Sequence, residues 1–242
     1  MFLKRYRRFI AAALLSAMIP GAEAVAKDWS GPYAGFNIGV HENEKLPADG
    51  AIFGNFTNPD FSNPISFSSG LQLGYNRQTG SIVLGGEVDA SWLSGKDTIS
   101  EFFFVPGILL FQTSGIRKQD WLTTFRLRLG YAPTDDVLFY ATGGVAAGRV
   151  NTSVNLSQDT LFVPLLFQEA GTLNKVMFGP AFGAGVEFRL FGNASMKAEY
   201  IRYDLGSASI PLIVVGGGSG DTYSFNNKGN IFRLGVNFNL DQ

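Results

Sequence analysis

Apolar and polar residues alternate along this chain over short stretches, with a period of two residues instead of three or four. In the last of these stretches, apolar residues stand at positions 232, 234, 236, 238 and 240, and mostly polar residues or glycine stand between them. A period of two is typical of β-strands, whose successive side chains point to opposite faces. The pattern predicts eight strands: Gly31–Val40, Ser66–Asn76, Ile82–Leu93, Gln119–Tyr131, Val137–Val150, Val176–Leu190, Ala194–Tyr203 and Gly229–Leu240.

The connections between these strands alternate strictly between long and short. The short ones are 77–81, 132–136 and 191–193, and the long ones are 41–65, 94–118, 151–175 and 204–228. Structureless loops of this length are uncommon in compact soluble domains. Membrane barrels have short turns at the periplasmic end and long loops at the other. We therefore predict an all-β fold: an eight-stranded antiparallel up-and-down transmembrane β-barrel with four long extracellular loops.

The first 26 residues have the layout of a secretory signal peptide. Basic residues at Lys4, Arg5, Arg7 and Arg8 precede an apolar stretch, Phe9–Ile19, which is too short to span a bilayer. Small residues then allow cleavage after Ala24 or Ala26. We therefore expect a signal peptide over 1–26 and an outer-membrane β-barrel domain over 27–242. This exported chain would reside in the cell outer membrane of a Gram-negative bacterium.

Composition narrows the function classes further. The chain has no cysteine and one histidine, and only 16% of its residues are charged. Disulfides and cysteine-based metal sites are thus excluded, and we expect no cofactor and no metal. Removal of the leader takes away four positive charges and one negative charge, which leaves a formal net charge near −4. A nucleic-acid partner is therefore not expected.

The polar face of the predicted strands carries an almost balanced set of charges. In a closed barrel these residues would point inward, where desolvated charges must be paired. An eight-stranded barrel is just wide enough to be filled by side chains. The alternative is an ordinary mixed-charge outer surface of a soluble barrel. The predicted lumen ion network comprises Glu87, Asp89, Arg126, Arg128, Glu187, Arg189, Lys197, Glu199 and Arg233.

Glycines and aromatic residues complete the pattern of the two faces. Glycines on the polar face, such as Gly74 and Gly185, would leave room for long arginine and glutamate side chains. Aromatic residues near strand ends are typical of the interfacial girdles of membrane barrels. The candidates for such girdles are Trp29, Tyr33, Trp92, Trp121, Tyr131, Tyr140, Tyr200 and Tyr203.

Five stretches resemble a known family. Trp29–Gly39 follows the pattern W-[ST]-G-x-Y-x-G-x-N-x-G, and Gly85–Asp89, Tyr140–Ala146, Lys197–Tyr200 and Arg233–Leu240 match further motifs in order. Together they are similar to small outer-membrane β-barrel proteins, namely opacity-type surface antigens and alphaproteobacterial outer-membrane proteins. The resemblance implies an eight-stranded barrel in the outer membrane and implies no particular activity. Members of this family usually end on an aromatic residue, whereas this chain ends with Asp241 and Gln242.

Candidate catalytic features are few. His41 is the one possible histidine base, beside Glu42 at the end of the first strand, and we expect a solvated loop-entry residue there. The glycine-rich run 216–220 lacks the lysine and helix of a phosphate-binding loop, so a flexible loop tip is expected. Glu87 and Asp89 could act as paired carboxylates, but they fit the ion network better. The chain is therefore not expected to be an enzyme.

The long loops contain prolines followed by apolar residues. One hypothesis is that these segments associate above the membrane into an apolar cap that binds a hydrophobic partner or forms a plug. The equally weighted alternative is that they extend the barrel strands beyond the bilayer. The apolar loop residues are Ile108, Leu109, Leu110, Leu165, Leu166, Leu212, Ile213 and Val214.

Four functions follow from these features. The leading hypothesis is a structural, surface-exposed barrel with a side-chain-filled lumen that supports envelope integrity and contacts a surface or a host protein. The others are a narrow porin-like channel for small solutes, a lipid-modifying barrel enzyme and a soluble lipocalin-like binder. Expected partners are outer-membrane lipid and lipopolysaccharide, the barrel assembly machinery and a host or surface protein.

Overall fold

The computed structural model describes residues 28–44, 65–105, 109–160, 167–215 and 218–241. The expected signal peptide lies outside these residues. No helix within the described segments is long and apolar enough to cross a membrane. The described residues form nine strands: β1 (Gly31–Asn43), β2 (Ser66–Thr79), β3 (Ile82–Leu93), β4 (Asp97–Val105), β5 (Leu109–Thr134), β6 (Val137–Thr160), β7 (Phe167–Arg189), β8 (Ala194–Val214) and β9 (Ser219–Asn239).

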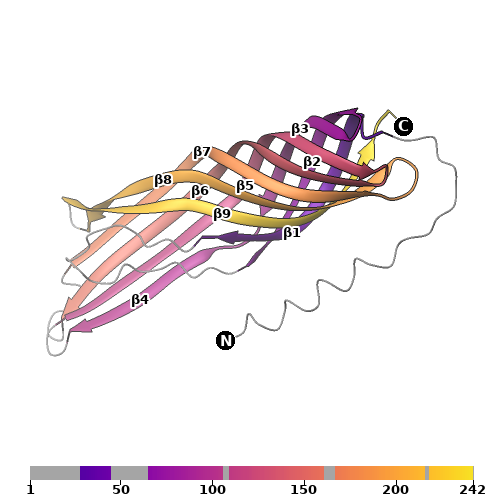
Figure 1. The fold of residues 1–242 in the computed structure, drawn as a ribbon. Coiled ribbons are helices and arrows are strands. Elements are labelled where there is room, and N and C mark those ends of the chain that lie inside the picture. The colour runs from indigo at the N-terminus through magenta and orange to yellow at the C-terminus, as the bar shows by residue number, and fades with distance from the viewer. Residues whose placement is uncertain (1–27, 45–64, 106–108, 161–166, 216–217, 242) are drawn as a thin grey trace.

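The strands form a closed antiparallel ring (Figure 1). Strand β1 pairs with β9, and β3 pairs with residues 121–131 of β5. The sheet therefore closes on itself through eight strands. Strand β4 pairs with residues 109–117 of β5. Gly95, whose backbone is in the left-handed region at φ 143°, lies between β3 and β4. The predicted eight-stranded up-and-down barrel is thus confirmed, with β4 as a continuation of β3.

Several strands run much further than the alternation predicted. Strand β5 has 26 residues, β6 has 24 and β8 has 21, so they extend into the segments expected to be loops. In Figure 1 the strands from β4 to β9 continue past the ends of β1 to β3. The described parts of the connections 94–118, 151–175 and 204–228 therefore form a raised β-sheet wall rather than irregular loops, whereas most of the connection 41–65 lies outside the described residues.

Strand β9 shows that the two faces exchange polarity along the barrel axis. Near its C-terminal end, Phe232 and Leu234 point outward and are more than half exposed, while Arg233 points inward. Further up, Phe225 points inward and is buried, and Asn226 points outward. A lipid-facing wall needs apolar residues outside, whereas a wall in water needs them inside. The exchange near residue 231 therefore marks the upper edge of the membrane band.

Aromatic residues divide between the band and the lumen. Trp92 and Trp121 pair across β3 and β5 near the upper edge of the band, and Tyr131 lies on the outer face near the lower edge. Tyr200 is half-buried, and its ring centre lies 4.7 Å from that of Phe232 on the outer face. For the other four residues the interpretation as girdle residues is wrong, because they are at most 6% exposed and lie inside the barrel. These inward aromatics are Trp29, Tyr33, Tyr140 and Tyr203.

Pro180 lies within a strand, as the sequence indicated, and the ladder is weakened beside it. Pro180 of β7 is in register with Val145 of β6. On the other side, the regular pairing of β7 with β8 is interrupted between Ala170 and Ala181. Proline has no N–H to donate, so a break in the ladder on one side of this residue is expected.

Candidate functional site: a closed barrel lumen

Three layers of side chains fill the lumen: an upper apolar layer, a middle ionic layer and a lower apolar layer. Along β5, Leu122 belongs to an upper apolar layer, Arg126 to a middle ionic layer and Ala132 to a lower apolar layer. The lower layer comprises Trp29, Val83, Ala132, Leu138 and Tyr140. The upper layer includes Leu93, Val150, Val154, Leu156, Ile201, Leu205, Ile210, Leu212, Tyr223, Phe225 and Ile231.

Arg126 stands at the centre of the ionic layer and is fully buried. Its Nη2 lies 2.7 Å from Glu87 Oε1 and 3.0 Å from Asp89 Oδ2, and its Nη1 lies 2.8 Å from Glu199 Oε1. Arg233 bridges the same three carboxylates at 3.2, 3.0 and 2.6 Å. Each carboxylate therefore meets two guanidinium groups, which is the pairing that buried charges require.

Two further bases complete this layer. Lys197 Nζ lies 2.7 Å from Glu87 Oε2. Arg128 pairs with Glu187, and its guanidinium carbon lies 3.7 Å from the centre of the Tyr140 ring. The layer thus holds four acids and four bases, all nearly inaccessible to solvent.

Arg189 is the one residue of the predicted network that lies elsewhere. Its guanidinium stacks over Trp29 at 4.4 Å from the ring centre. It also donates hydrogen bonds to the backbone carbonyls of Asp135 and Asp28. The last position of β7 places it at the rim that carries the short turns, where its side chain reaches the turn instead of the ionic layer.

Neutral polar side chains that were not part of the predicted ion network support the carboxylates. Tyr33 Oη donates to Glu87 Oε2 at 2.9 Å, and Asn237 Nδ2 donates to Glu187 Oε1 at 2.7 Å. Gln72 donates to Asn237, and Asn37 donates to Gln72. The inward parity of Asn37, Gln72 and Asn237 was visible in the alternation, whereas the role of Tyr33 required knowledge of the ring geometry.

Glycines next to the aromatic residues make the filled lumen possible. A Cβ atom on Gly74 would lie 2.2 Å from the Tyr33 ring, and one on Gly185 would lie 2.5 Å from the Tyr140 hydroxyl. Both tyrosines contact the ionic layer through Glu87 or Arg128. These two glycines are thus spacers for inward tyrosines.

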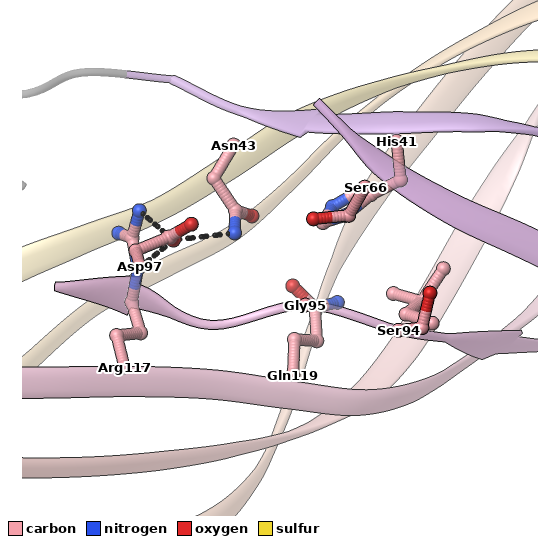
Figure 2. Close-up of a pocket in the computed structure, with 9 residues that line it drawn as sticks. His41, Asn43, Ser66, Ser94, Gly95, Asp97, Arg117 and Gln119 are labelled. Atoms are coloured by element: carbon pink, nitrogen blue, oxygen red, sulfur yellow. Dashed lines mark hydrogen bonds and ion pairs between the residues drawn. The ribbon is translucent and has the colours of Figure 1, made fainter. Parts of the chain in front are cut away.

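A second polar cluster lies at the upper edge of the band, where β1, β4 and β5 meet (Figure 2). Asp97 accepts hydrogen bonds from Arg117 Nη2 and from Asn43 Nδ2, both at 2.8 Å. His41 Nε2 lies 2.6 Å from the hydroxyl of Tyr203. Asp97 and Arg117 fall in a segment expected to be a loop, so the alternation gave no sign of this cluster.

The geometry of this cluster corrects the expectation for His41, which is buried and not a solvated loop-entry residue. Its neighbour in register on β2 is Ser66, and both line a cavity of about 10 Å³. Such a space holds about one water molecule, not a substrate. The hydrogen-bonding partner of the imidazole is the phenol of Tyr203.

The apolar loop residues that the structure describes lie in extended strands, and Leu212 and Ile213 face opposite sides of the wall. Leu212 and Ile213 are consecutive in β8, so Leu212 is buried in the upper layer and Ile213 is exposed. Leu109 and Leu110 lie in β5, and Val214 ends β8. For these residues the structure shows strand extension. Ile108, Leu165 and Leu166, together with positions 216 and 217 of the glycine-rich run, lie outside the described residues.

The closed ring, the outward apolar band and the inward ionic layer define a class of protein: an outer-membrane β-barrel. Comparison with known proteins agrees with this class. Residues 9–239 match the family model described as "Outer membrane protein beta-barrel domain". The chain belongs to this family, and its location is the cell outer membrane.

Named relatives come from alphaproteobacteria. The chain is 31% identical over 188 residues to the 31 kDa outer-membrane immunogenic protein of Brucella melitensis, covering 75% of this chain and 73% of that protein. It is 28% identical over 188 residues to the 22 kDa outer membrane protein of Rhizobium leguminosarum, covering 77% and 69%. The outer membrane protein OprG of Pseudomonas aeruginosa shares the fold, with a TM-score of 0.51, 11% identity and coverage of 89% and 100%.

Proposed function

We propose that this protein is a structural, surface-exposed barrel that supports envelope integrity and presents its raised wall to a surface or host partner. The ionic layer carries this proposal: eight buried charged side chains close the lumen at the depth of the membrane. Apolar layers lie above and below it. Together, these layers would prevent solute flow.

The same proposal includes export by a signal peptide, exposure at the cell surface and a role other than enzyme. A signal peptide over 1–26 would deliver the chain to the barrel assembly machinery. The Brucella relative is named an immunogenic outer-membrane protein, which supports exposure at the cell surface. The environment of His41 supports a role other than enzyme, because the imidazole contacts a buried phenol in a cavity too small for substrate.

Conductance in planar lipid bilayers tests the proposal. The wild-type protein should show no stable current steps. Glu187→Ala removes the partner of Arg128 and should produce measurable conductance. Arg202→Ala serves as the control, because its pair with Glu44 lies on the outer wall. Reproducible steps from the wild-type protein, reduced by added solute, would favour the narrow channel and overturn the closed barrel.

A further inference from the structure

Two basic side chains on the outer wall, just above the membrane band, form no ion pair among the described residues. They are Lys118 of β5 and Arg149 of β6, and both are exposed. Two other outward cations near this height are neutralised, since Arg202 pairs with Glu44 at 2.6 Å and Lys228 pairs with Asp204 at 2.9 Å. Lys118 and Arg149 therefore leave a local positive charge on the outer wall.

The strand register brings these two cations together. Lys118 is directly opposite Asn151, and Arg149 lies two positions away on the same face of β6. Such diagonal neighbours are about 7–8 Å apart, so two long side chains can converge on one anion. The bulge between Gln119 and Leu122 sets Asp120 opposite Arg149, but the Asp120 carboxylate accepts a hydrogen bond from Asn151 at 2.6 Å.

The depth of the pair matches a lipid headgroup. Below Arg149 on the outer face of β6, Val145 is 58% exposed and belongs to the apolar band. Trp121 lies in the same bulge, at the height where aromatic residues mark the interface. Above Arg149, the outward positions of β6 are Asn151, Ser153 and Asn155. The cations thus lie between an apolar surface and an uncharged polar surface.

We propose that this patch, Lys118 and Arg149 with Asn151 and Ser153 above them, binds a phosphorylated glycolipid of the outer leaflet. This inference rests on the membrane position in the proposed function. The guanidinium and the ammonium bind the phosphate group, since both are strong phosphate ligands. The amide and hydroxyl groups above them hydrogen-bond to sugar hydroxyls. The acyl chains lie against the apolar band around Val145.

Native mass spectrometry of lipid retained by the protein tests this assignment. The wild-type protein and Lys118→Glu/Arg149→Glu are placed in phosphatidylcholine nanodiscs that contain bisphosphorylated lipid A, and are then released in detergent. We expect the variant to retain at least about tenfold less lipid A, because each basic residue near an anionic surface contributes about 1 kcal/mol. Arg77→Glu is the matched control, since Arg77 is exposed on β2 near the opposite rim.

A second lipid and a second double variant separate the possible outcomes. Nanodiscs with phosphatidylglycerol at equal charge distinguish a glycolipid site from general attraction to anionic lipid. Equal retention of the two lipids overturns the glycolipid assignment, as does equal retention of lipid A by the wild-type and double-variant proteins. Lys118→Gln/Arg149→Gln, with an unchanged heat shift on gels, keeps the test valid if charge reversal disturbs folding. Failure of this proposal leaves the closed lumen intact, because conductance does not depend on the patch.

Discussion

Arg126→Met should destabilise the barrel by about 3–5 kcal/mol, because removal of one member of a buried ionic cluster leaves its partners uncompensated. Glu87, Asp89 and Glu199 each lose one of their cationic contacts, and the layer changes from balanced to a net charge of −1. Methionine replaces the aliphatic part of the arginine side chain and carries no charge, so the lost ion pairs dominate the expected change. Urea unfolding in lipid vesicles, followed by tryptophan fluorescence, measures the effect.

The double variant Arg126→Met/Glu199→Gln is the control for this effect. It removes one base and one acid that are in contact at 2.8 Å, and so restores the charge balance. We expect it to be more stable than Arg126→Met alone, because neutral replacement of a buried pair costs less than removal of one partner. A double variant whose destabilisation equals the sum of the two single variants would show that the charges act independently.

Leu127→Arg should cost about 2–4 kcal/mol, the penalty for a cation on the lipid face of a barrel at the bilayer midplane. Leu127 points outward from β5 and is 66% exposed in the isolated barrel. Its neighbours in register are Gly86 on β3 and Gly143 on β6, which offer no long side chain to shield a charge.

Ile116→Arg is the matched control on the same strand and the same face. Ile116 is 41% exposed and lies above the bulge that follows Gln119, beyond the membrane band. We expect a change within about 0.5 kcal/mol, the usual range for a surface substitution. Both variants are measured by urea unfolding in vesicles. Equal penalties at the two positions would mean that the assigned band is wrong.

The alternation predicted the membrane half of the barrel well because the lipid-facing pattern there is continuous. In β9, residues 232 to 238 alternate without interruption, so both faces could be assigned from the sequence. The upper half was harder because the phase changes. In β8 the register shifts between Asp204 and Ser207, so the inward positions change from Tyr203 and Leu205 to Ala208 and Ile210.

The candidate site was predictable as a set of residues but not as a set of contacts. The inward charges follow from strand parity, except for Arg189 at the rim. Which acid meets which base depends on the closure of the ring, since Arg126 contacts Glu199 across 73 positions of sequence. Tyr33 and Tyr140 were wrongly interpreted as interfacial girdle residues, because an aromatic residue near a strand end fits either an interface or a filled lumen.

Cysteine labelling on intact cells tests most directly where the membrane band lies on this barrel. The chain has no native cysteine, so single cysteines can be introduced without background. A membrane-impermeant maleimide should label Thr222→Cys on the raised wall and should not label Leu234→Cys in the band. Arg77→Cys, near the rim with the short turns, should react only after the outer membrane is permeabilised. Labelling of Leu234→Cys on intact cells, or protection of Thr222→Cys, would contradict the assigned position of the barrel in the membrane.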